Sequence, residues 1–422
     1  MHFCFGSHVG RAAARSIGVT CTAVLTVLLL APASAAPARP TDDREVRALW
    51  VVRTSLTSPA AVAEMVRRAQ AGQFNTLLVQ VRGRGDAYFN DGLEPRAAAL
   101  AGQPDSFDPL AATLKLAHAQ GIRVHAWINI ALVASAIDAP ASRGHMVYAH
   151  PEWLMVPRPL ARDMVLLDAH SQLYLDKLMR WARSQSGEVE GLYASPIPQE
   201  AADATVAIVA DIVSRYPVDG VHLDYIRYPN DEFDYSREAL QAFKASVVQS
   251  LDESERRQRE RALGPDLVGW ADAFPDRWRE FRRDRLTTLV TRLRESVKTR
   301  RPEALFSAAV LPDAAEASSR RLQDWGTWLQ QQLLDVVCPM AYATDAAAFT
   351  AQVASTRQAA GSRQVWAGIG AYRLSSSQTI ENIQIARRLG VSGVVLFSYD
   401  SLISLPKGVE YLAQVARAAF SK

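Results

Sequence analysis

The amino-acid sequence predicts an α/β protein with a (β/α)8 TIM barrel that is lengthened by long insertions after strands 3 and 4. Short apolar segments rich in β-branched residues alternate with longer amphipathic segments, as in βα units whose parallel strands are buried on both faces. Eight such apolar segments occur, which is the number of strands in this barrel. No internal repeat or low-complexity linker indicates a second domain, so residues 44–420 are assigned to one barrel.

The predicted strands follow one another along the whole of this domain. They cover residues 46–52, 75–81, 122–130, 218–224, 304–310, 335–341, 364–369 and 393–398. Helices are expected after most of these strands, because suitable cap residues stand at their ends. Ser58 and Pro59 begin the first helix and Gly72 ends it, while helices over 107–120 and 377–389 also end at glycines.

The residues in excess of a plain barrel of about 250 residues fall in two connections. The connection 131–217 contains predicted helices over 171–184 and 200–215, and the connection 225–302 contains a long helix over 275–300. Both connect a strand to the helix that follows it. They therefore open at the C-terminal face of the barrel, where enzymes of this architecture have their active sites.

A doubly wound open sheet is the alternative fold. Such a sheet normally has a glycine-rich phosphate-binding loop after its first strand, and residues 52–56 contain no glycine. The pair Gly368 and Gly370 is too short a match to the motif. The sequence therefore argues against a nucleotide-binding protein, and we expect no cofactor.

Residues 1–35 have the three parts of a signal peptide. A basic stretch is followed by an apolar run over 17–30 and by Ala33-Ser34-Ala35, which fits a signal peptidase site. The apolar run is shorter than the roughly 20 residues that a membrane span needs. We therefore expect cleavage after Ala35 and an exported protein, periplasmic or extracellular, without a stable membrane anchor.

Cleavage would leave Cys338 as the only cysteine, so no intramolecular disulfide is expected. Cys338 stands in an apolar predicted strand, which indicates a buried, structural thiol. The whole chain has a net charge of +3 with 22% charged residues. This near balance argues by itself neither for nor against an anionic partner, and no nucleic acid partner is predicted.

Polar residues gather where the third and fourth predicted strands end, although buried parallel strands should be apolar. His125, Trp127 and Asn129 alternate with apolar neighbours, and so do His222 and Asp224. Each group therefore lies on one side of its strand. A carboxylate that points into a barrel mouth costs several kcal/mol unless it is paired or functional.

Asp224 is for this reason the central catalytic candidate. The alternative interpretation is a structural salt bridge to Arg82, Arg84 or Arg227. Aromatic side chains and hydrogen-bonding groups at the other strand ends are suited to a sugar, with rings stacked on its apolar faces. The candidate substrate-binding residues are Trp50, Gln80, Arg82, His125, Trp127, Asn129, His222, Tyr225, Arg227, Tyr228, Met340, Tyr342 and Tyr399. The aromatic ring expected around the opening comprises Trp127, Trp153, Tyr228, Tyr342, Tyr372 and Tyr399.

Three kinds of hydrolytic chemistry can be compared. Serine hydrolysis lacks a Gly-x-Ser-x-Gly motif, and barrel metallohydrolases often begin with a His-x-His that the first strand lacks, so no metal is predicted. A glycosidase needs two carboxyl groups, roughly 5 to 5.5 Å or 6.5 to 9.5 Å apart. Asp224 is one of them. The candidates for the other are Asp86, Glu94, Glu152, Asp231, Glu232 and Asp234.

Eight segments in order resemble the glycosyl-hydrolase-like family 10 domain of bacterial exported proteins, and the resemblance covers nearly the whole mature chain. They are Arg47-Ala-Leu-Trp50-Val, the segment from Phe74-Asn75-Thr76 to Gln80-Val-Arg82, Val124-His125-Ala-Trp127-Ile-Asn129, His150-Pro-Glu-Trp153, Val218-Asp-Gly-Val-His222-Leu-Asp224-Tyr-Ile-Arg-Tyr-Pro229, Trp278 to Arg283, Pro339-Met340-Ala-Tyr342, and Phe397-Ser-Tyr399.

The resemblance implies a barrel related to glycoside hydrolases, with glycan substrates and, in some members, cleavage of peptidoglycan strands. It also implies that Asp224 is the catalytic carboxylate of strand 4, and that Arg82, His125, Asn129 and His222 line the site. Many members carry a second acid directly after this aspartate, where this chain has Tyr225. A pair of carboxylates on strand 4 is therefore excluded.

Our leading hypothesis is an exported glycoside hydrolase that cleaves peptidoglycan or a related bacterial polysaccharide. Asp224 would be the nucleophile or base, and a loop carboxylate, Asp86 or one near Asp234, would be the acid. A non-catalytic glycan-binding barrel is the second hypothesis, motivated by the missing partner acid. A metal-dependent hydrolase is the third.

Overall fold

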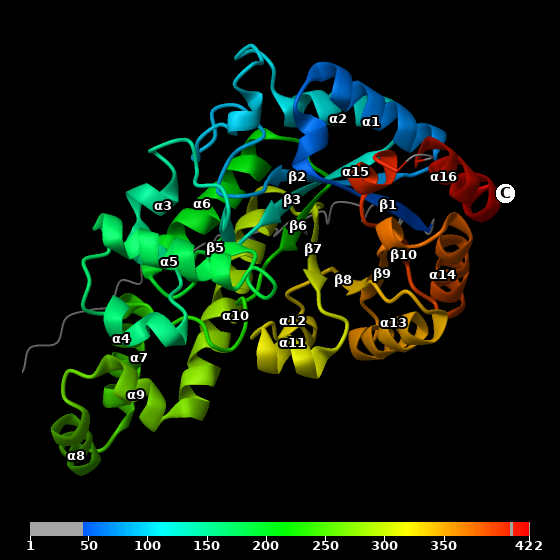
Figure 1. The fold of residues 1–422 in the computed structure, drawn as a ribbon. Coiled ribbons are helices and arrows are strands. Elements are labelled where there is room, and N and C mark those ends of the chain that lie inside the picture. Colours follow the sequence, from blue (N-terminus) through cyan, green and yellow to red (C-terminus); the bar gives the residue numbers. More distant parts are fainter. Residues whose placement is uncertain (1–44, 406–407, 422) are drawn as a thin grey trace, which may run out of the picture. The chain divides into compact units, whose positions relative to one another are not determined.

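Eight parallel strands close into a barrel in the computed structural model, which describes residues 45–405 and 408–421 (Figure 1). Around the barrel the strands lie in the order β1-β10-β9-β8-β7-β6-β3-β2. Their bounds are β1 (Val46–Val51), β2 (Thr76–Arg82), β3 (Arg123–Asn129), β6 (Gly220–Asp224), β7 (Leu305–Val310), β8 (Val336–Ala341), β9 (Gln364–Ile369) and β10 (Gly393–Leu396). The predicted TIM barrel is confirmed, and each predicted strand overlaps an observed one.

The side chains on the inner side of the strands form a core of their own inside the barrel. Trp50, Leu78, Cys338 and Trp366 belong to it, and all of them are almost completely buried. Cys338 is a free, buried thiol, as the sequence predicts. The outward-facing residues of the strands pack against the surrounding helices in a second, larger core. The barrel is therefore a packed cylinder, and in enzymes with this architecture the active site lies at the C-terminal ends of the strands.

Helices cover the outside of this cylinder (Figure 1). They are α1 (Pro59–Ala71), α2 (Pro109–Ala119), α6 (Gln199–Arg215), α10 (Pro275–Arg300), α11 (Ala314–Arg320), α12 (Trp325–Gln330), α13 (Ala346–Ala360), α14 (Ser376–Arg388), α15 (Tyr399–Ile403) and α16 (Gly408–Val415). The predicted caps of α1 are present, since the Ser58 side chain accepts a hydrogen bond from the Ala61 amide at 3.1 Å and Gly72 is the C-cap. Helix α14 begins one residue earlier than predicted because Ser375 and Gln378 form a capping box.

The connection from β3 to β6 contains a small antiparallel sheet that the sequence analysis missed. It consists of β4 (Leu132–Ser135) and β5 (Gly191–Tyr193), and the helices α3 (Met146–Ala149), α4 (Ala161–Met164) and α5 (Gln172–Ser184) lie between them in the chain. A Cβ atom at Gly191 would lie 1.8 Å from the carbonyl oxygen of Ala134. Only glycine allows this approach, which brings the preceding residue, Glu190, to the barrel mouth.

The connection from β6 to β7 contains α7 (Arg237–Ser250), α8 (Glu253–Leu263) and α9 (Leu267–Ala273) before the long helix α10. Helix α8 has no buried residues and carries most of the charges of residues 252–261. None of the helices formed by the described residues is long and apolar enough to cross a membrane. The predicted signal peptide, residues 1–35, lies outside these residues.

Candidate functional site

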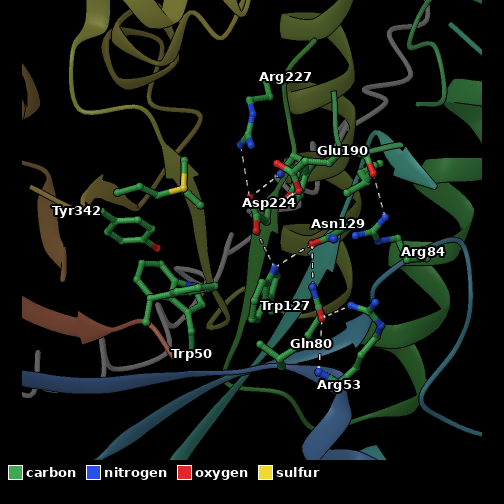
Figure 2. A pocket seen from close by; sticks show the side chains of 16 residues that line it. Trp50, Arg53, Gln80, Arg84, Trp127, Asn129, Glu190, Asp224, Arg227 and Tyr342 are labelled. Atoms are coloured by element: carbon green, nitrogen blue, oxygen red, sulfur yellow. Dashed lines mark hydrogen bonds and ion pairs between the residues drawn. The ribbon is translucent and has the colours of Figure 1, made fainter. Parts of the chain in front are cut away.

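A pocket of about 310 Å³ opens at the C-terminal ends of the strands (Figure 2). We call it the barrel-mouth pocket. Nine predicted site residues line it: Trp50, Gln80, Trp127, Asn129, Asp224, Tyr225, Arg227, Met340 and Tyr342. Seven further residues complete the lining, and they were not among the predicted site residues: Val52, Arg53, Arg84, Leu132, Glu190, Ala309 and Phe397. The pocket is thus built from the ends of most barrel strands and from the β4–β5 sheet.

Asp224 ends strand β6 and is only 8% exposed. Its Oδ2 accepts a hydrogen bond from Trp127 Nε1 at 3.2 Å, and its Oδ1 accepts one from the backbone amide of Tyr225 at 2.7 Å. The nearest Arg227 nitrogen lies 3.7 Å from Oδ1, which is an ion pair without a hydrogen bond. Burial raises the pKa of the Asp224 carboxyl, although Arg227 and the two N–H donors act in the opposite direction.

Tyr225 contacts two carboxylates of the pocket. Its backbone amide binds Asp224, while its phenol donates a hydrogen bond to Oε2 of Glu190. The residue has a φ of 48°, a left-handed conformation that is strained for a bulky side chain. Such strain persists where the surrounding structure imposes it. Tyr225 stands where the sequence lacks a second acid after Asp224. Its phenol instead binds an acid from the connection between β3 and β6, Glu190.

Glu190 is the functional candidate that the sequence analysis missed. It is exposed, lines the barrel-mouth pocket and contributes to raising the pKa of Asp224 through like-charge repulsion. No strand was predicted around it, since residues 191–193 form a strand too short to be recognised in a long connection. One feature of the sequence could have indicated it: Glu190 stands directly before the apolar segment Gly191-Leu-Tyr-Ala194.

A chain of amide side chains joins the ends of β2 and β3. Gln80 donates from Nε2 to Oδ1 of Asn129 at 3.3 Å, and its Oε1 accepts from Arg53 at 2.9 Å. Oδ1 of Asn129 also accepts from Trp127 Nε1 at 3.0 Å, and Asn129 Nδ2 donates to the Gly83 carbonyl at 2.9 Å. These bonds orient the polar groups that face the pocket (Figure 2).

Trp50, Tyr342 and Phe397 form an aromatic wall of the pocket. The rings of Tyr342 and Phe397 are stacked with centroids 5.5 Å apart, and Trp50 meets both of them edge to face. Figure 2 shows Trp50 and Tyr342 on one side of the pocket and Asp224 on the other. The pocket therefore has an aromatic, apolar side and a side that carries a carboxyl group.

His222 lies beneath the pocket and does not line it. Its Nε2 is 3.0 Å from Trp50 Nε1, and its Nδ1 is 3.0 Å from Ser307 Oγ. Since an indole can only donate, Nε2 accepts and the proton is on Nδ1. Burial lowers the pKa of His222 to about 3, so the ring is neutral. His222 therefore orients Trp50 instead of binding substrate.

Four other predicted substrate-binding residues also lie away from the pocket lining. Arg82 forms a buried, bidentate ion pair with Glu94 at 2.6 and 2.7 Å. His125 is fully buried beside Trp366, and burial lowers its pKa to about 3. Tyr228 is completely buried, and Tyr399 begins α15 with 1% of its surface exposed. Period-two alternation assigns His125 to one side of β3, but it does not give the depth of the side chain in the barrel.

Of the expected aromatic ring, only Trp127 and Tyr342 line the barrel-mouth pocket. Trp153 instead stacks on His150 with ring centroids 3.8 Å apart. Tyr372 is 40% exposed and meets Tyr342 edge to face.

The two loop aspartates expected to be the acid do not line the pocket. Asp86 accepts a hydrogen bond from the backbone amide of Arg84 at 2.9 Å and so shapes the loop after β2. Asp234 is completely buried, and its Oδ1 accepts from the amides of Val156 and Ser236 at 2.9 and 2.7 Å. Both carboxylates bind loop backbone, which accounts for them structurally.

A metal centre has no set of ligands in the part of the chain that the structure describes. No three His, Cys, Asp or Glu side chains gather there in a way that could hold an ion. His222, the histidine closest in sequence to Asp224, uses both ring nitrogens for hydrogen bonds within the barrel.

The known proteins that this chain resembles in sequence include two named glycosyl hydrolases. Glycosyl hydrolase YngK of Bacillus subtilis (strain 168) is 23% identical over 416 residues, which cover 87% of this chain and 71% of that protein. Glycosyl hydrolase DigH of Escherichia coli (strain K12) is 22% identical over 349 residues, which cover 74% of this chain and 69% of DigH.

Among solved structures, the PgaB (BpsB) glycoside hydrolase domain from Bordetella bronchiseptica has a similar fold. Its TM-score is 0.60 at 16% identity, and the match covers 90% of this chain and all of that domain. A β-galactosidase from Bacillus circulans sp. alkalophilus has a TM-score of 0.59 at 11% identity, covering 88% of this chain and 55% of the enzyme. The model of the glycosyl hydrolase-like 10 family matches residues 45–383. Because this match spans most of the chain, the protein belongs to the glycosyl hydrolase-like 10 family of glycoside hydrolases.

Proposed function

We propose that this protein is an exported glycoside hydrolase that cleaves the glycan strands of peptidoglycan or a related bacterial polysaccharide, with Asp224 and Glu190 as its two carboxyl groups. The observation that carries the proposal is that both acids line one pocket and that Tyr225 binds both. Two carboxyl groups across a scissile bond are the requirement of most glycosidases.

The environments of the two acids assign their roles. Burial raises the pKa of Asp224, which favours the protonated form that a general acid needs. Glu190 is exposed to solvent and accepts a hydrogen bond from the Tyr225 phenol, so it lies where it can reach a substrate from the solvent side. Asp224 would then protonate the glycosidic oxygen, and Glu190 would act on the other side of the bond. This assignment reverses the role of Asp224 as nucleophile or base that the sequence suggested.

The remaining lining residues suit a sugar ring. Tyr342 and Phe397, the partly exposed rings of the aromatic wall, offer apolar surface, and the amides of Gln80 and Asn129 line the pocket in an orientation fixed by hydrogen bonds. The predicted signal peptide and the resemblance to exported bacterial barrels support a substrate outside the cytoplasm. Cell-wall glycan is the abundant polysaccharide that a bacterial enzyme meets there.

The proposal is tested by reducing-end release from peptidoglycan glycan strands stripped of their peptides. The purified protein should release reducing ends, and Asp224→Asn should lower the rate by about a thousandfold or more, as expected for loss of a catalytic carboxyl. Asp231→Asn is the matched control, since this acid is exposed and lies outside the barrel-mouth pocket. Binding of the strands without any product, unchanged in Asp224→Asn, would favour the glycan-binding barrel instead.

A further inference from the structure

The barrel-mouth pocket is lined by three arginines, Arg53, Arg84 and Arg227, but by only two acids. Within the described residues, Arg227 is the one member of this set with a carboxylate inside 4 Å, that of Asp224. Even with both acids charged, two carboxylates face three guanidinium groups. The pocket then has an excess of positive charge.

Arg53 and Arg84 lie next to each other on one side of the pocket. A Cβ atom at Gly83 would lie 2.5 Å from Arg53 Cδ and 2.9 Å from its Nη1, so the Arg53 side chain runs across the backbone directly before Arg84. Figure 2 shows both guanidinium groups on the side where Gln80 and Asn129 lie. Arg53 is held there by its hydrogen bond to Gln80.

Two nitrogen atoms of the pocket arginines have no hydrogen-bond acceptor among the described residues. Arg84 Nε is buried with no hydrogen-bond partner, and its Nη1 is 3.5 Å from the Glu190 carbonyl, at the limit of a hydrogen bond. Arg227 Nη1 is also buried without a hydrogen bond. Leaving a buried charged donor unsatisfied is unfavourable, so these groups favour a ligand that brings acceptor oxygens with negative charge. The planar fork of a guanidinium matches the two oxygens of a carboxylate, as it also matches those of a phosphate.

We propose that Arg53 and Arg84 form a carboxylate subsite, which binds an acidic group carried by a sugar of the substrate and so selects acidic glycans. This inference rests on the proposed function for the presence of a glycan in the pocket. Two sources carry the same chemistry: the lactyl ether of peptidoglycan strands and the carboxylate of a hexuronic acid. Neutral β-linked glycans lack the group and should bind more weakly.

The test is a binding measurement, which does not depend on turnover. Asp224→Asn protein is titrated with three soluble polymers: peptide-free glycan strands, the same strands with their carboxyl groups amidated by methylamine, and a hexuronate oligomer. The free strands should bind about tenfold or more tightly than the amidated strands. Affinity for the hexuronate oligomer identifies which acidic sugar the subsite accepts.

The same titration is repeated in Asp224→Asn protein that also carries Arg84→Gln, Arg53→Gln or the control Arg180→Gln. Arg84→Gln should remove the preference for free carboxyl groups while affinity for amidated strands stays nearly the same. Arg53→Gln gives an independent readout if the Arg84 variant does not fold. The Arg180→Gln substitution, at an exposed residue of α5, should leave the preference intact.

Three results would overturn the inference: equal affinity for both strand forms, binding of neither form, or a preference that survives both the Arg84→Gln and the Arg53→Gln substitution. Absence of hydrolysis by the unsubstituted protein, with this preference present, would instead contradict only the proposed function.

Discussion

Asp224 combines burial with three groups that favour its charged form, and burial outweighs them. The pKa of Asp224 is therefore raised, as it is for other carboxyl groups whose charged form is disfavoured by an apolar site. Tyr225 connects this acid to Glu190 through a strained backbone, which is typical of functional positions. At the residue scale, the proposed chemistry therefore depends on the environment of one carboxyl group.

The cost of burying Asp224 predicts how stability depends on pH. A raised pKa in the folded state means that stability falls as pH rises above the pKa of the unfolded chain. Asp224→Asn should therefore not lower the free energy of unfolding at pH 7, although it abolishes activity. If the variant has a higher free energy of unfolding than the unsubstituted protein, this difference should disappear below about pH 4, where the carboxyl group is also protonated in the unfolded chain. Urea unfolding at both pH values checks this, and a large loss of stability at pH 7 would show that the charged carboxylate is structural.

Arg227 predicts a shift in the pH profile. Its positive charge lowers the pKa of Asp224, so Arg227→Gln should raise that pKa further. If Asp224 must be protonated, kcat/KM falls as pH rises through this pKa. The alkaline limb of the profile should therefore move to higher pH by about one unit in the variant. An alkaline limb that stays in place or moves to lower pH would contradict Asp224 as the acid, and Arg180→Gln serves as the unshifted control.

The limits of sequence-based prediction are clearest for His222. Alternation along the fourth predicted strand, which is β6 in the structure, placed His222 and Asp224 on the same side, and the structure agrees. The two residues are two positions apart along the strand, however. This separation is enough to move a side chain from the mouth of the barrel into its core. His222 and His125 therefore became interior residues, whereas Asp224, at the strand end, was identified correctly as a pocket residue.

Individual elements show why Glu190 was missed. The eight barrel strands could be predicted because each is an apolar run bounded by caps and turns. The β4–β5 sheet pairs two segments more than 50 residues apart with only a few residues each, and nothing local marks that pairing. The positions of Leu132, in β4, and of Glu190, directly before β5, depend on this pairing and therefore became visible only in the structure.

The loop after β2 is fixed by the ion pair of Arg82 and Glu94. The guanidinium also donates to the carbonyls of Asn129 and Ile130 at the end of β3, so it joins two strands. Glu94→Gln leaves a buried cation without its counter-charge, and we expect it to lower the free energy of unfolding by about 3 kcal/mol. Urea denaturation measures the change. Glu316→Gln, in an exposed pair with Arg320, is the control and should have almost no effect, whereas an equal effect of both would argue against a structural role for Arg82.

At the scale of the whole molecule, the barrel closes where β1 meets β10. The order of the apolar runs in the sequence was sufficient to predict this closure, because eight βα units have few other ways to bury their strands. The contact itself depends on Gly393, where a Cβ atom would lie 2.5 Å from Val46 Cβ and 2.6 Å from its carbonyl oxygen. Closure therefore requires a residue without a side chain at this point.

Gly393→Ala should accordingly destabilise the barrel by about 1–3 kcal/mol through overpacking. The matched control is Gly326→Ala in α12, where no atom lies within 4 Å of the added methyl group. That substitution should be neutral or slightly stabilising, because alanine favours a helix over glycine. Both variants can be compared by urea unfolding, and a Gly393→Ala protein as stable as the control would show that the closure tolerates a side chain.

The account as a whole depends on Asp224 and Glu190 acting as one catalytic pair. The most direct test is the kcat of reducing-end release from peptide-free glycan strands for Asp224→Asn, Glu190→Gln and the double variant. If the two acids act together, each single substitution lowers kcat by about a thousandfold, and the double substitution lowers it little further, since residues that act as a unit are not additive. A Glu190→Gln protein with nearly full activity, or a double variant whose loss is the product of two independent losses, would contradict the pair.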